Sequence, residues 1–169
     1  MATGFQVLVI MCGMNTLQGS LSAPNARIAI VASRWNEDIV QPLIEGAVRA
    51  LLAAEVREED ITLIRVPGAF EIPLMLGQLA ESEQYEGLIA LGCVVRGETT
   101  HYDTVSNEVA RGMMNVMQDY GIPVGYGVLC VENMAQAVAR ASKKDDTHNK
   151  GVEAADAVIE MLNLFAQLD

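Results

Sequence analysis

The sequence predicts an α/β fold in which one parallel sheet of four strands is covered by helices on both faces. Four short segments are nearly continuous in apolar residues, longer segments with helical periodicity alternate with them, and hydrophobic residues make up 51% of the 169 positions. Apolar runs of about four to eight residues are typical of strands that are buried on both faces, as in parallel sheets. Strands that alternate with helices along a chain form open sheets with crossover connections.

The strands are expected where the apolar runs lie, at 28–33, 61–66, 88–95 and 124–131. The segments between them carry apolar residues three or four positions apart, which is the spacing of one helix face. Helices are therefore expected at 38–55, 70–81, 102–120, 133–140 and 151–166. The turn Gly121-Ile122-Pro123 fits the end of the third helix, because glycine commonly ends a helix and proline keeps the following chain extended.

The length is that of one domain. We expect residues 27–169 to form it, and residues 1–26 to be a partly flexible N-terminal extension that can add a swapped or edge strand to the sheet. The apolar stretch at 5–14 is too short to span a bilayer. The first basic residue is Arg27, so no secretory leader is expected.

Composition argues against several classes of function. A formal net charge of −11 is unfavourable for a protein that coats nucleic acid or an anionic membrane, so neither is expected as a partner. The three cysteines, Cys12, Cys93 and Cys130, form no CxxC pattern, which argues against disulfides and a metal site and favours a reducing, cytoplasmic location. The high apolar content favours a buried subunit interface, hence a homo-oligomer.

The carboxyl ends of parallel strands meet at one edge of the sheet, and ligands bind there. Trp35, the only tryptophan, follows the first expected strand, and Asn36 or Asp38 can cap the next helix. Trp35 is interpreted either as a packing residue or as a platform on which a planar ligand stacks.

After the second expected strand, Pro67 keeps the chain extended and Gly68 permits a tight turn. A helix beginning near Ala69 and Phe70 leaves unpaired backbone N–H groups at the strand ends, with Phe70 as a second aromatic residue there. Glu71 falls in the first turn, where its interaction with the helix dipole is sufficient to explain a carboxylate.

The loop after the third expected strand contains Gly97, Thr99 and Thr100, and a helix begins near His101. A helix N-terminus with free amides and nearby hydroxyl groups binds phosphate or another anion. Because histidine titrates near neutral pH, His101 is a candidate for proton transfer, and a purely structural role is the alternative.

A basic segment contains all the lysines of this acidic chain, together with one arginine and one histidine: Arg140, Lys143, Lys144, His148 and Lys150. Lys143 and Lys144 are expected in a solvated loop, whereas Arg140 can bind a small phosphate through two N–H groups. No GxxxxGK[ST] or GxGxxG motif occurs, so nucleoside triphosphates and dinucleotides are not expected. Together, the strand ends suit a flat heterocycle beside a small phosphorylated molecule.

Five segments resemble lumazine synthase, the penultimate enzyme of riboflavin biosynthesis. They are RWNEDIV at 34–40, VPGAFEIP at 66–73, LGCVVRGETTHYD at 91–103, GIPVGYGVLCVEN at 121–133 and NKG at 149–151. The resemblance extends from about Arg27 to the C-terminus. It implies a flavodoxin-like αβα sandwich. It also implies condensation of 5-amino-6-(D-ribitylamino)uracil with 3,4-dihydroxy-2-butanone 4-phosphate, releasing phosphate and water, with neither a metal nor an organic cofactor.

The resemblance also implies roles for single residues. Trp35 would stack on the pyrimidine, and the other positions that would line the ring and ribityl site are Asn36, Ala69, Phe70, Glu71, Cys93, Val94 and Val95. His101 would be the proton shuttle, and the phosphate would be bound by Glu98, Thr99 and Arg140. Tyr126, reached from a neighbouring subunit, and Lys150 match further substrate-site positions.

The sequence departs from the family in the segment 140–151, which is longer and less rich in glycine than is common there. This longer form favours a free pentamer or a pair of pentamers over a 60-subunit shell. Two alternatives to the enzyme are a structural shell and a module that binds flavin or lumazine without turnover. A binding module would need Trp35 and Phe70 but neither His101 nor Arg140.

Overall fold

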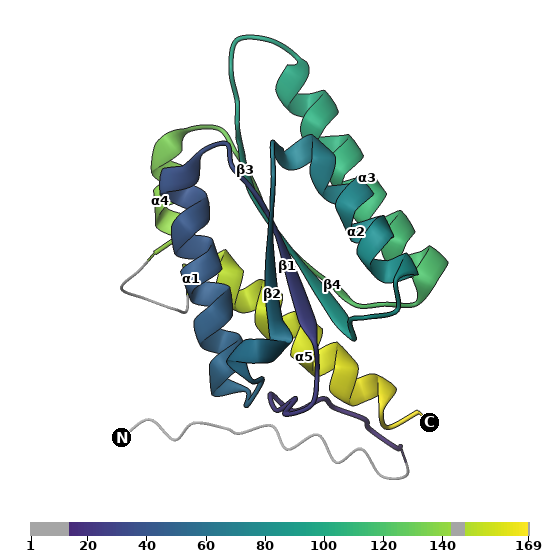
Figure 1. Cartoon of the computed structure of the whole chain (residues 1–169). Helices are drawn as coiled ribbons and strands as arrows, with labels where there is room; N and C mark the ends of the chain where they lie inside the picture. Colours follow the sequence, from purple (N-terminus) through teal and green to yellow (C-terminus); the bar gives the residue numbers. More distant parts are fainter. Residues whose placement is uncertain (1–13, 143–147, 169) are drawn as a thin grey trace, which may run out of the picture.

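The computed structural model describes residues 14–142 and 148–168, which form three layers (Figure 1). Four parallel strands in the order β2-β1-β3-β4 make the sheet: β1 (Ile28–Ser33), β2 (Ile61–Val66), β3 (Gly87–Val95) and β4 (Val124–Val131). Within the described residues, the α-helices are α1 (Glu37–Ala53), α2 (Ile72–Glu81), α3 (His101–Tyr120), α4 (Met134–Arg140) and α5 (Lys150–Phe165). The predicted α/β fold with a four-stranded parallel sheet is confirmed.

The two faces of the sheet are covered by different helices (Figure 1). One apolar cluster joins alternate residues of β1, such as Ile28 and Ile30, to α1 and α5, and the other joins Ala29 and Val31 to α2 and α3. The first five residues of β1 are fully buried, as expected for a central strand covered on both faces.

The second α-helix begins later than its apolar periodicity predicts. Residues Ala69–Glu71 form a short 3-10 turn (η2), and α2 starts at Ile72. Pro73 has no backbone N–H and fits best in the first turn of an α-helix, which is where it lies in α2. A second 3-10 turn, η1 (Glu58–Asp60), precedes β2.

Residues 14–26 form no strand, and residues 18–22 of this stretch contact the C-terminal half of α5 and the residues after it. Figure 1 shows the chain before β1 passing beside the end of α5. Asn163 of α5 accepts a hydrogen bond from the Ser20 hydroxyl (2.7 Å) and donates one to the Ser22 carbonyl (2.9 Å). A Cβ on Gly19 would lie 2.2 Å from the Glu160 carbonyl oxygen, so only glycine allows this approach. Of residues 1–26, which were expected to be able to add a swapped or edge strand, residues 1–13 lie outside the described residues.

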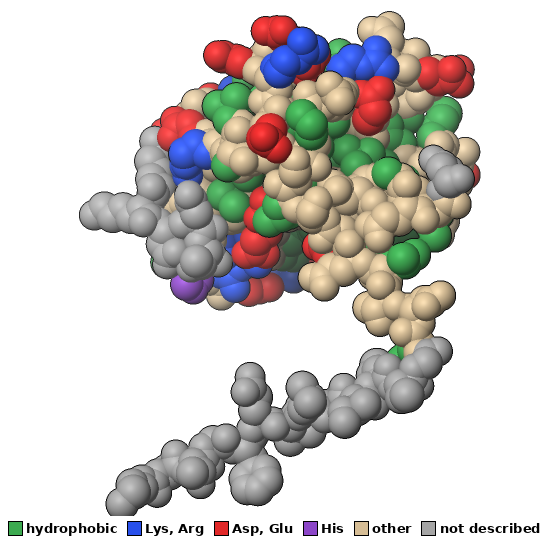
Figure 2. Space-filling model, turned by 90° about the horizontal axis from the view of Figure 1, so that it is seen from below, with side chains coloured by type: hydrophobic (Ala, Val, Ile, Leu, Met, Phe, Trp, Pro, Cys, Tyr) green, Lys and Arg blue, Asp and Glu red, His purple; other side chains and the backbone are tan. Residues whose placement is uncertain are grey.

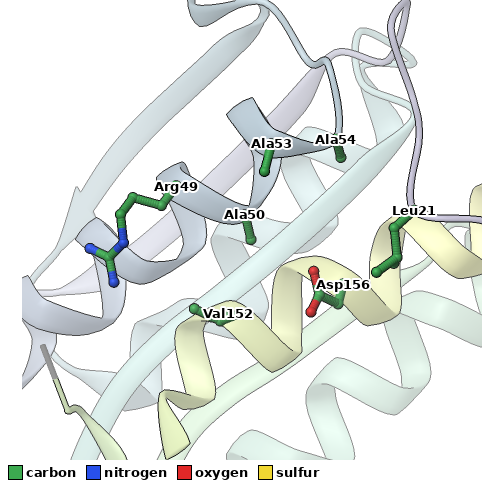
Figure 3. A pocket seen from close by; sticks show the side chains of 7 residues that line it. All are labelled: Leu21, Arg49, Ala50, Ala53, Ala54, Val152 and Asp156. Atoms are coloured by element: carbon green, nitrogen blue, oxygen red, sulfur yellow. The ribbon is translucent and has the colours of Figure 1, made fainter. Parts of the chain in front are cut away.

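A groove runs between α1, α5 and Leu21 (Figure 3). Its volume is about 340 Å³, and small apolar residues form much of its lining. Burial, followed by the nearby charges of Glu153 and Glu160, raises the pKa of Asp156, which points into the groove, whereas Arg49 points away from Asp156. The groove presents no pair of facing catalytic groups.

The start of α5 is held against α1 by Asn149, which is fully buried. Its side-chain nitrogen donates to the carbonyls of Pro42 (3.1 Å) and Ser142 (2.9 Å), and its oxygen accepts from the Gly151 N–H (2.8 Å). A Cβ on Gly151 would lie 2.0 Å from the Leu43 carbonyl oxygen. Two residues of the NKG motif therefore have a packing role.

Candidate active site

A cavity of about 650 Å³ lies at the carboxyl ends of β1, β2 and β3. Because β1 connects outward to β2 and the chain then crosses to β3, these ends form the crevice in which open α/β sheets bind ligands. The volume falls within the usual range for small-molecule sites. The cavity is lined by Trp35, Asn36, Gly68, Ala69, Phe70, Glu71, Cys93, Val94, Val95, His101, Thr104 and Val105.

The turn after β1 directs Trp35 to the cavity. Asn36 has a left-handed backbone conformation (φ 57°), which asparagine tolerates better than most residues. Its side-chain nitrogen donates to the Cys93 carbonyl (2.8 Å), and it makes no capping bond to α1, so the expected cap at Asn36 is absent. Trp35 is 73% exposed, so within this chain it is not a core residue.

The turn after β2 is closed by a hydrogen bond from the Gly68 N–H to Oε2 of Glu71 (2.8 Å). Glu71 thus stabilises the loop to which it belongs. Its carboxylate also interacts favourably with the dipole at the nearby helix start. Among the contacts of the described residues, only Oε2 is engaged, which leaves Oε1 for a ligand. Phe70, 55% exposed, gives the cavity a second aromatic surface.

The end of β3 provides a neutral wall. Cys93 is 3% exposed, and burial, with a smaller effect of Cys130, raises the pKa of the Cys93 thiol to about 11. The thiol therefore stays protonated at neutral pH and is a poor nucleophile. Its contribution is apolar surface, together with the carbonyl that orients Asn36.

His101 is the first residue of α3, and its neighbours on the same helix face are Thr104 and Val105. Sequence reasoning missed these two residues and Gly68 as cavity lining. Positions three and four after His101 share its face of a helix, so helical spacing was the signal that could have identified them.

A family model described as 6,7-dimethyl-8-ribityllumazine synthase matches residues 25–166 and so includes every residue that lines the cavity. The chain belongs to this family. The lumazine synthase family implies a transferase-type enzyme that forms lumazine in riboflavin biosynthesis, acting on small molecules. The resemblance drawn from the motifs is confirmed at the level of the family.

Five other positions assigned from the lumazine synthase resemblance do not line the cavity: Glu98, Thr99, Tyr126, Arg140 and Lys150. Glu98 and Thr99 lie in the exposed loop that leads into α3. Tyr126 lies on the edge strand β4, and burial, followed by Cys130, raises its pKa. Arg140 ends α4 and donates to the Gln136 carbonyl (3.1 Å), while Lys150 begins α5 and pairs with Glu153.

Of the other residues of the basic segment, His148 is exposed just before Asn149, whereas Lys143 and Lys144 lie outside the described residues, as does Cys12. Over the described ranges, no three His, Cys, Asp or Glu side chains are grouped closely enough to hold a metal ion. None of the helices described here is long and apolar enough to cross a membrane.

Proposed function

We propose that the chain condenses 5-amino-6-(D-ribitylamino)uracil with 3,4-dihydroxy-2-butanone 4-phosphate to 6,7-dimethyl-8-ribityllumazine, releasing phosphate and water. One observation carries the proposal: Trp35, Phe70 and His101, which follow three different strands of a chain of this family, line a single cavity. A cavity with two aromatic surfaces and one titratable group suits a planar substrate that reacts by proton transfer.

In this proposal the pyrimidine stacks against Trp35, and its ribityl chain binds Glu71 through Oε1. The phosphate of the second substrate binds in the loop of Glu98 and Thr99, at the N-terminus of α3, where unpaired N–H groups favour an anion. Cys93, Val94 and Val95 form the wall beside the ring, with Asn36 and Ala69 at its edge.

The reaction begins when the 5-amino group attacks the ketone carbon, and loss of water then gives a Schiff base. Loss of the C3 proton and of phosphate from C4 gives an enol, and the enol tautomerises to a carbonyl at C3. The ribityl-bearing nitrogen then closes the ring on this carbonyl with loss of water. These steps move protons at nitrogen, oxygen and carbon, and His101 shuttles them. No step creates a very unstable charge, so holding the two substrates together supplies most of the acceleration.

We further propose a homopentamer, alone or paired with a second, in the cytoplasm. In this assembly a neighbouring subunit brings Tyr126, Arg140 and Lys150 to the cavity. The support is that these residues lie outside the cavity of their own chain and that Tyr126 is 48% exposed on an edge strand. Residues 27–169 form the catalytic domain, and residues 1–26 are its extension.

The test is an absorbance assay for lumazine after the two substrates are mixed with the purified protein. Turnover is expected for the wild type. His101→Ala should remain folded and lose at most about 10²–10⁴-fold, the usual range for general acid–base help. Complete loss of turnover in folded His101→Ala would contradict the proposal that holding the two substrates together contributes more to the rate than proton transfer does.

The assigned phosphate contact is tested with Arg140→Ala, which should raise the KM for the phosphorylated butanone. Arg57→Ala, which removes an arginine paired with Asp60 outside the cavity, is the control. An unchanged KM in Arg140→Ala removes that assignment. If the wild type forms no lumazine but lumazine quenches Trp35 fluorescence, the chain is a binding module.

A further inference from the structure

Arg96 makes an unusual set of contacts just beyond β3. Its Nη1 and Nη2 donate to the two carboxylate oxygens of Asp103 (3.1 and 2.9 Å), and Nε donates to Glu132 (2.7 Å). The guanidinium carbon lies 4.0 Å from the ring centre of Tyr102, and the backbone N–H donates to the Val131 carbonyl (2.9 Å). The guanidinium thus joins the first turn of α3 to the end of β4.

These contacts are on the back of the helix turn whose front lines the cavity. Successive residues of an α-helix are about 100° apart, so positions 101, 104 and 105 share one face, and positions 102 and 103 lie on the other. The first group lines the cavity, and Arg96 holds the second group.

The loop that connects β3 to this turn has little other support. Residues 97–100 are all exposed, and a Cβ built on Gly97 would meet no atom within 4 Å. The positions of Glu98, Thr99 and His101 therefore depend on where the two ends of the loop are held. One end is Val95 in the sheet, and the other is the turn held by Arg96.

The charge of Arg96 is committed to its own chain. Two carboxylates, Asp103 and Glu132, share one guanidinium, so the cluster carries no surplus positive charge for a substrate. Hydrogen bonds from Arg96 lower the pKa of Asp103, so this pair stays ionised at neutral pH. A direct phosphate contact by Arg96 would require one of these pairs to break.

We propose that Arg96 is a positioning residue, which sets His101 and the Glu98–Thr99 loop against the cavity through the back of the first turn of α3. This inference deepens the proposed function and rests on it. It predicts that the phosphorylated substrate and the chemical step depend on Arg96, whereas pyrimidine binding at Trp35 and Phe70 does not.

The kinetic test uses Arg96→Met, Asp103→Asn and the control Arg57→Met, since Arg57 also pairs with two carboxylates, away from the cavity. Arg96→Met and Asp103→Asn should each lower kcat by about tenfold and raise the KM for the phosphorylated butanone. The KM for the pyrimidine should change by less than about twofold, and the control should match the wild type. A general loss of structure would instead change both KM values.

The direction in which Asp103→Asn changes phosphate affinity distinguishes a positioning role of Arg96 from direct phosphate binding by Arg96. Removing this carboxylate loosens the turn but frees the guanidinium. A positioning role therefore weakens binding of inorganic phosphate and of the phosphorylated substrate, as Arg96→Met does. Tighter phosphate binding in Asp103→Asn, with loss of binding in Arg96→Met, would overturn the proposal.

Hydrogen exchange of the substrate-free protein supplies a measurement independent of activity. The amides of Asp103 and Thr104 both donate to the Thr100 carbonyl (3.0 and 3.2 Å). They should exchange about tenfold faster in Arg96→Met and Asp103→Asn, and at the wild-type rate in Arg57→Met. Unchanged exchange in Arg96→Met and Asp103→Asn overturns the positioning role. Faster exchange in these two variants, together with a wild type that forms no lumazine, would count only against the proposed function.

Discussion

Trp35 and Asn36 show how the conformation of one residue decides the environment of the next. Asn36 adopts a left-handed conformation, and its side chain binds the Cys93 carbonyl, so the chain turns sharply between β1 and α1. The indole is consequently 73% exposed at the cavity and not buried in the sheet. Its contribution is expected in ligand binding and hardly at all in folding.

Replacing Trp35 by Ala should therefore raise the KM for the pyrimidine by about 10–100-fold. The reason is the loss of about 1.5–3 kcal/mol of stacking and apolar contact. Steady-state kinetics measures the change in KM. A thermal melt measures the change in stability, and the melting temperature should change little. Leu168→Ala, at a position 71% exposed, is the control for loss of an exposed apolar side chain. Equal KM values in both variants would contradict ligand stacking.

Cys93 should react slowly with iodoacetamide. With its pKa raised to about 11 by burial, only about a thousandth of the thiol is ionised at pH 8. The rate should increase about tenfold per pH unit until about pH 11, because only the thiolate reacts. Peptide mapping by mass spectrometry follows the modification, with the urea-unfolded chain as control. Alkylation of the folded protein as fast as that of the unfolded chain would refute this prediction.

At the scale of elements, Asn149 and Asn133 begin two neighbouring helices with very different surroundings. Both accept a backbone N–H at a helix start. Asn133 is exposed, whereas Asn149 is buried and also donates to two carbonyls. The same cap therefore has a larger structural role at α5 than at α4.

Asn149→Ala should lower the free energy of unfolding by about 2–4 kcal/mol, because the cap is lost and buried carbonyls lose their donor. Asn133→Ala should cost about 1 kcal/mol, the usual value for a cap alone. Urea denaturation at one fixed protein concentration measures both. A similar cost for the two variants would show that the contacts of Asn149 to Pro42 and Ser142 contribute little.

The strands were predictable because each is a local apolar run, and three of the four have the predicted bounds, the exception being β3, which begins at Gly87. The α2 helix starts later than predicted, with Pro73 in its first turn, a backbone feature that apolar periodicity does not register. Many cavity residues could be named because family motifs follow the strands. The role of Arg96 could not be predicted, because its partner Glu132 is 36 positions away and no sequence pattern links the two residues.

At the scale of the whole molecule, apolar side chains remain exposed on both helical layers and beside the cavity. Leu74 of α2 is 73% exposed, Met114 of α3 51%, and Val138 of α4 57%. From the end remote from the cavity, acidic and basic side chains lie interspersed around further apolar patches of the described surface (Figure 2). Exposed apolar surface of this kind is typical of subunit interfaces.

If the proposed pentamer or pair of pentamers forms, the mass in solution should be that of five chains or ten, as measured by sedimentation or native mass spectrometry. Oligomers assembled from equal amounts of Trp35→Ala and Arg140→Ala chains give a sharper test. If a neighbouring subunit supplies Arg140, about a quarter of the sites in such oligomers combine an intact Trp35 with an intact Arg140. These oligomers should therefore recover about a quarter of wild-type activity. Each variant assembled alone is the control. Absence of recovery in mixed assemblies would place each site within one chain.

The end of α5 and the residues before β1 lie at the same end of the molecule, opposite the carboxyl ends of the strands (Figure 1). An anchor joined after α5 would thus attach this chain to a solid support from behind. Its crevice would then face the bulk solution, so the protein could be immobilised for flow-through measurements without obstructing entry of either reactant into the attached subunit.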